Sequence, residues 1–113
     1  MNQLCVITGV AGSLGCALST AFIERGYSVF GIDHVEPATI DNIEYYRADL
    51  DRIVYNSTEK EALLDAINIW KGKSAIRVLI NNAAYQYISK CHPIELEKIT
   101  RTLNVNLIAP YIL

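Results

Sequence analysis

Apolar residues divide the chain into short continuous runs and longer amphipathic stretches. Four runs rich in β-branched and aromatic residues predict strands: residues 4–8, 27–33, 43–50 and 75–84. The segment 34–42 is too short and too broken for a full helix, so we expect a loop with at most one turn. The other intervals carry apolar residues at helical spacing. The predicted order is therefore strand, helix, strand, loop, strand, helix, strand, helix.

Three helices are predicted, each with its own start or stop signal. The first ends before Gly26, a natural C-cap. The second contains the capping-box pair Thr58 and Glu61, and the third opens at Pro93. Their apolar stripes predict the faces that pack on the sheet: Leu14, Ala17, Leu18, Ala21 and Phe22; Ala62, Leu63, Ala66, Ile67 and Trp70; Leu96, Ile99, Leu103 and Leu107.

Strands that alternate with helices pair in parallel through right-handed crossovers. We therefore predict an α/β fold, a Rossmann-type doubly wound parallel sheet with strand order 3-2-1-4, in one domain spanning residues 1–113. The domain is expected to be incomplete at its C-terminal end. The fourth strand then has an unpaired edge and the last helix exposes apolar area, which predicts a homo-oligomer or a chain that is unstable alone.

Composition excludes several classes of function. The 113 residues carry 12 acidic and 10 basic side chains without blocks of either sign, which argues against a nucleic-acid partner. No apolar run reaches the ~18–20 residues of a membrane span, and the N-terminus is typical of a strand rather than a signal peptide. The three cysteines, Cys5, Cys16 and Cys91, do not have the spacing of metal ligands, even together with His34 and His92, so we expect no metal site. We expect their thiols to be reduced and the protein to be cytoplasmic.

The turn after the first strand has the context of a dinucleotide-binding fingerprint. Gly9 would make the tight turn, Gly12 would let the backbone approach a pyrophosphate, and Gly15 would let the helix lie close to the sheet. The free N–H groups at the helix N-terminus would meet the phosphate charge. An ordinary tight turn without a ligand is the alternative.

Asp33 favours the ligand-binding interpretation. It ends the second strand, where a carboxylate would accept hydrogen bonds from the adenosine ribose hydroxyls. The same carboxylate would repel a 2′-phosphate, and the glycine turn offers no Arg or Lys to attract one. The cofactor is therefore predicted to be NAD, with NADP less favoured, although an imidazolium at His34 would partly offset the repulsion.

Five short motifs occur in the order found in one enzyme family. They are TGVAGSLG (8–15), Asp33, ADL (48–50), NNAA (81–84) and NVNL (104–107). Together they span nearly the whole chain, which resembles the short-chain dehydrogenase/reductase family. The resemblance implies an oxidoreductase that transfers a hydride between a nicotinamide cofactor and an alcohol or carbonyl of a small-molecule substrate.

The resemblance also implies a role for each matched residue. Asp49 would meet the adenine amino group, Leu50 would pack beside the ring, and Asn106 would be catalytic, helping to hold a water in the proton relay. The residues implied in cofactor binding are Thr8, Gly9, Gly12, Ser13, Leu14, Gly15, Asp33, Asp49, Leu50, Asn82 and Ala83. Of these, Asn82 and Ala83 would lie beside the ribose on the nicotinamide side.

Two positions depart from the family pattern. Ser13 stands where the common T-G-x-x-x-G-x-G form has glycine, so the turn instead fits the T-G-x-x-G-x-x-G of extended members through Gly12. The later motifs are similar to those of the single-domain members, which leaves the branch open. Ala84 replaces the usual glycine and should crowd the nicotinamide site slightly.

The family's proton-donating tyrosine has a lysine four residues later, and no tyrosine of this sequence does. The catalytic serine and Tyr-x-x-x-Lys are thus expected outside these 113 residues. The first hypothesis is the N-terminal part of an NAD-dependent oxidoreductase, which is inactive without the rest. The alternatives are a non-catalytic nucleotide-binding or interaction module, and an α/β domain without a nucleotide ligand.

Overall fold

A parallel four-stranded sheet forms the centre of the computed structural model, which describes residues 3–36, 40, 42–86 and 95–113. Its described strands are β1 (Gln3–Thr8), β2 (Tyr27–Asp33), β3 (Glu44–Arg47) and β4 (Ile76–Ile80). Their order across the sheet is β3-β2-β1-β4, and every pairing is parallel. The predicted doubly wound topology is confirmed.

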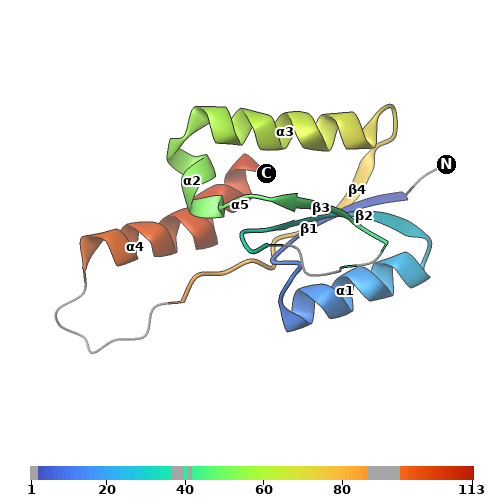
Figure 1. The fold of residues 1–113 in the computed structure, drawn as a ribbon, viewed down its shortest axis with the longest axis horizontal. Helices are drawn as coiled ribbons and strands as arrows, with labels where there is room; N and C mark the ends of the chain where they lie inside the picture. The colour runs from blue at the N-terminus through green and yellow to red at the C-terminus, as the bar shows by residue number, and fades with distance from the viewer. Residues whose placement is uncertain (1–2, 37–39, 41, 87–94) are drawn as a thin grey trace.

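Helices cover both faces of the sheet. Helix α1 (Ser13–Glu24) lies on one face and α3 (Ser57–Lys71) on the other (Figure 1). Successive residues of β1 point to opposite faces, so Val6 packs toward α3 while Cys5 packs toward α1. The core therefore has two layers with β1 between them. Gly26, with φ +87°, follows α1 as predicted, and its N–H donates to Ile23 O.

The parallel register aligns the carboxyl ends of three strands at one edge of the sheet. Thr8 lies opposite Ile32, and Ile7 lies opposite Ile80. The Gly9 N–H then donates to Ile32 O at 2.8 Å, which turns the chain over the end of β2. The segments that follow β1, β2 and β4 are therefore brought together.

The predicted third strand is too long. Only Glu44–Arg47 pairs with β2, and a helix that the sequence analysis missed, α2 (Leu50–Tyr55), begins three residues later. Asp49 caps this helix, because its Oδ1 accepts from the Asp51 N–H at 2.9 Å. The predicted fourth strand also ends early, at Ile80.

The predicted cap of α3 is wrong. The helix begins at Ser57, and its cap is Asn56, whose side-chain oxygen accepts from the Glu59 N–H at 3.1 Å. An asparagine just upstream offered a better acceptor than the Thr58 and Glu61 pair. Within the predicted apolar stripe of α3, Leu63 and Ile67 are buried and Ala66 and Trp70 are partly buried, whereas Ala62 is exposed.

The last helical segment changes geometry along its length. It consists of α4 (Leu96–Leu103), a π-helical turn η1 (Asn104–Ile108) and α5 (Ala109–Ile112). Figure 1 shows α4 projecting away from the sheet, while α5 lies beside α2, and both η1 and α5 contact α2. Val105 and Ala109 are the residues of this segment that enter the apolar core. The predicted start at Pro93 falls outside the described residues.

The predicted buried face of this helix is wrong. Leu96, Ile99, Leu103 and Leu107 are 75%, 43%, 50% and 53% exposed. Their spacing is helical, but α4 extends beyond the sheet, so the sheet does not cover these side chains. Asn104, beside the exposed Leu103, is buried, and its Nδ2 donates to Asp51 Oδ1 at 2.9 Å.

Candidate functional site

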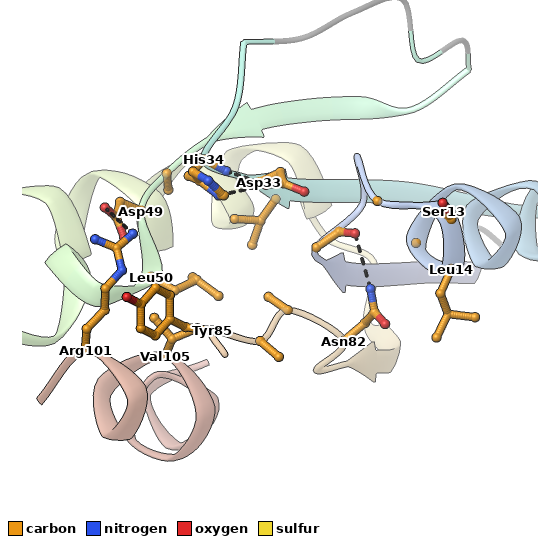
Figure 2. A pocket seen from close by; sticks show the side chains of 17 residues that line it. Ser13, Leu14, Asp33, His34, Asp49, Leu50, Asn82, Tyr85, Arg101 and Val105 are labelled. Atoms are coloured by element: carbon orange, nitrogen blue, oxygen red, sulfur yellow. Dashed lines mark hydrogen bonds and ion pairs between the residues drawn. The ribbon is translucent and has the colours of Figure 1, made fainter. Parts of the chain in front are cut away.

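A groove of about 390 Å³ lies where the segments after β1, β2, β3 and β4 meet (Figure 2). It is lined by Gly9, Gly12, Ser13, Leu14, Gly15, Ile32, Asp33, His34, Ala48, Asp49, Leu50, Asn82, Ala83, Ala84, Tyr85, Arg101 and Val105. All of the predicted cofactor-binding residues except Thr8 are among them. Ligands of open α/β sheets bind at this carboxyl edge.

The glycine turn is closed so tightly that two positions accept no side chain. A Cβ at Gly9, which has φ +70°, would meet Ala83 Cα at 2.9 Å. A Cβ at Gly15 would lie 2.1 Å from Gly9 O. A methyl group added at Gly12 would have Gly9 O as its nearest atom, at 3.5 Å, so the space beside Gly12 is open. Gly9 and Gly15 shape the turn, and Gly12 leaves room beside it.

The N-terminus of α1 points its free amides at this groove. Gly12 is the N-cap and supplies no side-chain acceptor, and the first turn holds no acidic residue. The N–H groups of Ser13, Leu14 and Gly15 have no partner within the helix, because the first intrahelical bond is Cys16 N to Gly12 O at 2.8 Å. Such a helix end attracts an anion, and it fits the pyrophosphate of a dinucleotide.

Thr8 supports the groove from behind. Its buried Oγ1 accepts from the Asn82 N–H at 3.1 Å and the Ala83 N–H at 3.0 Å. Asn82 Nδ2 donates to Gly9 O at 3.2 Å, the contact drawn in Figure 2. These bonds hold the segment after β4 against the glycine turn. Thr8 therefore positions two groove-lining residues and does not line the groove itself.

Asp33 ends β2 at the edge of the groove with both carboxylate oxygens in use. Oδ2 accepts from the Ala11 N–H at 3.0 Å, and Oδ1 accepts from the His34 N–H at 2.7 Å. The His34 Nδ1 also lies 3.1 Å from Oδ1, an ion pair when the imidazole is protonated. Oδ2 keeps a further lone pair, so Asp33 fixes the turn and can still accept a hydrogen bond from a ribose hydroxyl.

A second cation near Asp33 escaped the sequence analysis, which considered only the glycine turn and His34. Arg47, at the end of β3, donates from Nε to His34 O at 3.1 Å and forms an ion pair with Glu36. The parallel pairing of Asp33 with Arg47 brings this guanidinium to the same end of the sheet. Its charge is already partnered by a carboxylate.

Asp49 and Leu50 lie at the opposite end of the groove from Ser13 and Leu14 (Figure 2). The cap of α2 uses Asp49 Oδ1, while Oδ2 lies 3.7 Å from Arg101 Nη2. Arg101 itself lies over the ring of Tyr85, with its Cζ 4.9 Å from the ring centroid. This end of the groove therefore combines an acidic, a cationic and an aromatic side chain.

Arg101, Val105 and Tyr85 were not predicted as lining residues of this groove. Arg101 and Val105 are four positions apart, a spacing that places them on one side of a helix. Which side faces the groove depends on how η1 docks against α2, and the sequence carries no local signal for that.

Asn106 lies in η1 and binds the main chain that follows β4. Its Oδ1 accepts from the Tyr85 N–H at 2.8 Å, and its Nδ2 donates to Tyr85 O at 2.9 Å. These two bonds couple the π-helical turn to the segment that follows β4, and π-helical turns within helices are frequent at functional sites. Asn106 does not line the groove described above.

The remaining chemistry of the described residues is limited. They contain no group of three or more His, Cys, Asp or Glu placed to hold a metal ion. Among these same residues, no helix is both long and apolar enough to cross a membrane. Cys5 and Cys16 are free thiols, and burial raises the pKa of Cys5 to about 11. Cys91 and His92 lie outside the described residues.

The model of the short-chain dehydrogenase family matches residues 3–113. The chain belongs to this family, as the motifs predicted.

Relatives and solved structures agree on the family and the fold. An uncharacterized oxidoreductase, YxjF of Bacillus subtilis, is 26% identical over 98% of this chain and 45% of its own length. An NADPH-dependent 3-dehydrocapnine reductase of Ornithobacterium rhinotracheale is 26% identical over 92% of this chain and 38% of its own. A 4-hydroxyisoleucine dehydrogenase complexed with NADH superposes with a TM-score of 0.81 at 23% identity, covering 98% of this chain and 46% of that one. The chain thus spans less than half the length of these three proteins.

Proposed function

We propose that this chain forms the cofactor-binding part of an NAD-dependent oxidoreductase that transfers a hydride between a nicotinamide and an alcohol or carbonyl substrate. One observation carries the proposal. The free amides of the α1 N-terminus, the Asp33 carboxylate and the Asp49 carboxylate line one groove, in the order in which a dinucleotide presents phosphates, ribose and adenine. The family supports the reaction class.

NAD is preferred in this proposal because of the charges around Asp33. A 2′-phosphate would meet the Asp33 carboxylate, and Arg47 is already paired with Glu36. Solved relatives include an NADH-dependent reductase, A1-R′, complexed with NAD, at a TM-score of 0.82 and 23% identity over 98% of this chain. The Ornithobacterium relative is NADPH-dependent by name, so the preference requires a direct test.

A bound nicotinamide would supply or accept the hydride. In this chain, Asn82 and Ala83 would form the wall on the nicotinamide side, held there by Thr8. Asn106 would orient a water in the proton relay. The serine and the Tyr-x-x-x-Lys that complete such an active site would come from sequence outside the 113 residues.

A fluorescence titration with NADH and NADPH tests the proposal. The protein as its own gene produces it should bind NADH saturably and more tightly than NADPH. Asp33→Ala should weaken NADH binding about 10-fold or more, the cost of losing charge-assisted hydrogen bonds, and should reduce the preference over NADPH. Asp65→Ala, on the exposed face of α3, is the matched control and should change neither. If the protein does not bind NADH, the proposal is wrong. If Asp33→Ala leaves the ratio of the affinities for NADH and NADPH unchanged, the account of selectivity is wrong.

We also infer that copies of the chain associate. The exposed apolar stripe of α4 and the edge of β4, which pairs with no other described strand, support this. The free thiols of Cys5 and Cys16 suit a cytoplasmic protein.

A further inference from the structure

Two asparagines, two positions apart, tie the π-helical turn η1 to different parts of the fold. Asn104 is buried, and its Nδ2 donates at 2.9 Å to Oδ1 of Asp51, in the first turn of α2. Asn106 binds the main chain of Tyr85 on the segment that follows β4, through Oδ1 at 2.8 Å and Nδ2 at 2.9 Å. Val105, between them, enters the apolar core. The turn is therefore held from two sides.

Asn104 is also the residue on which the π-helical geometry depends. The Ala109 N–H donates to Asn104 O, five residues back, whereas a regular α-helix would direct it to Val105 O. Pro110 has no N–H, so it cannot make the bond to Asn106 O that would continue a regular helix. The proline permits a break at this place but does not specify the orientation of the turn. The side-chain bond from Asn104 to α2 does specify it.

The bond between Asp51 and Asn104 can resist displacement of the turn. Its acceptor is a carboxylate and its donor residue is buried, with Asn104 6% exposed. A charge-assisted hydrogen bond contributes more than a neutral one, and a buried amide left unpaired is unfavourable. Asp51 is fixed in turn, because its N–H donates to Asp49 Oδ1 at 2.9 Å and Ile53 anchors α2 in the core. Asp51 is thus a firm partner for Asn104.

We propose that Asp51 and Asn104 are positioning residues, whose bond sets the orientation of η1 that brings the Asn106 amide to Tyr85. The proposed function gives Asn106 a role in the proton relay, so the catalytic meaning of this inference rests on that proposal. Neither Asp51 nor Asn104 is among the residues that line the groove. The pair therefore acts through Asn106 and not by contact with the cofactor.

Amide hydrogen exchange and NMR measure the position of Asn106 without a cofactor or a substrate, in the protein as its own gene produces it. The Tyr85 N–H is protected while Asn106 Oδ1 accepts from it, and the Asn106 side-chain N–H resonances report the bond to Tyr85 O. Asp51→Ala removes the acceptor of the Asn104 side chain. Asn104→Asp instead places two carboxylates in contact.

The Tyr85 amide should exchange about 10-fold faster in Asp51→Ala, and at least as fast in Asn104→Asp, as expected for the loss of one charge-assisted hydrogen bond. The Val6 amide, in the central strand β1 that pairs on both sides, is the internal reference and should accelerate less. Adding Asp51→Asn to Asn104→Asp restores one amide and one carboxylate with the partners exchanged. This double variant should return the Tyr85 rate to near the wild-type value. Asp65→Ala, on the exposed face of α3, is the matched control and should change neither amide.

Three results would overturn the inference. If Tyr85 and the Asn106 side-chain resonances stay unchanged in both single variants, the turn keeps its orientation without this bond. If the Tyr85 and Val6 amides accelerate equally, Asp51 and Asn104 support only the overall stability. If the double variant exchanges as fast as Asn104→Asp, the hydrogen bond is not the cause.

Two further outcomes are kept apart by the design. Asp51→Ala changes a half-buried side chain and decides between these results alone if Asn104→Asp does not fold. Failure of the wild-type protein to bind NADH would overturn the proposed function and the relay role of Asn106. It would leave the exchange rates, and the positioning that they measure, unaffected.

Discussion

The substitution Gly15→Ala tests how closely α1 approaches the glycine turn. The added Cβ would lie 2.1 Å from Gly9 O and 2.7 Å from Val10 Cα. Ordinary contacts begin at 3.4 Å, so the start of α1 would have to move by more than about 1 Å. Both obstacles are backbone atoms, and no side-chain rotation relieves them.

The expected cost follows from that displacement. Overpacking a tight interior site costs about 1–3 kcal/mol, and a clash with backbone belongs at the upper end. We expect Gly15→Ala to lower the free energy of unfolding by about 3 kcal/mol and to weaken NADH binding, because the displaced helix carries the amides at the groove. Urea unfolding, followed by circular dichroism, measures the loss of stability. The midpoint of the transition should shift to lower urea while the dependence of the unfolding free energy on urea keeps its slope.

Gly12→Ala is the matched control. Its Cβ would meet only Gly9 O, at 3.5 Å, so the turn can stay closed. The expected loss of stability is about 1 kcal/mol or less, since alanine is a poorer N-cap than glycine. An unchanged midpoint for Gly15→Ala, or equal destabilisation by both substitutions, would refute the geometry of the turn.

Four further predictions concern the rest of the molecule. Thr8→Val leaves two main-chain N–H groups without their acceptor and should lower the free energy of unfolding by about 2 kcal/mol in the same assay. Iodoacetamide at pH 8 should alkylate the exposed Cys16 well before the buried Cys5, whose pKa of about 11 keeps the thiol protonated, as peptide mass mapping would show. Because the folded-state pKa of Cys5 is raised, its contribution to stability should be complete below about pH 9 and be lost as the pH rises toward 11. Leu103→Glu combined with Leu107→Glu should lower the mass measured by light scattering, because both exposed side chains lie on the apolar stripe of α4 and η1.

Thr58→Val, at an exposed position of α3, should leave stability nearly unchanged, and equal losses at Thr8 and Thr58 would remove the role assigned to Thr8. Alkylation of Cys5 as fast as Cys16 would contradict its burial. A wild-type protein that is already a stable monomer would contradict association through α4.

Local features of the sequence predicted the parts of the site that depend on local geometry. The glycine turn follows a buried strand and opens a helix, so its shape could be inferred from neighbouring residues. Asp33 could be placed because the end of a parallel strand has a known position in the sheet. Thr8 was assigned to the same segment, but its tie to Asn82 and Ala83 joins residues more than 70 positions apart.

The sequence predicted burial and side-chain partners less well where tertiary contacts determine them. The leucine stripe of α4 has helical spacing, yet burial depends on a neighbour that no described element provides. Asn104 is polar, but Asp51 supplies a buried partner from another helix. Arg101 is one of several charged residues in α4, and only the docking of η1 against α2 brings it to Asp49. Such contacts leave no periodic signal in the chain.

The most direct test of the cofactor site is amide chemical-shift mapping by NMR during a titration with NADH. The account predicts saturable shifts for the amides of Ser13, Leu14 and Gly15 and for those of Asp33 and Asp49, all of which line the groove. If NADH leaves these amides unchanged, or shifts only residues elsewhere on the surface, the groove is not a dinucleotide site and the proposed function is wrong.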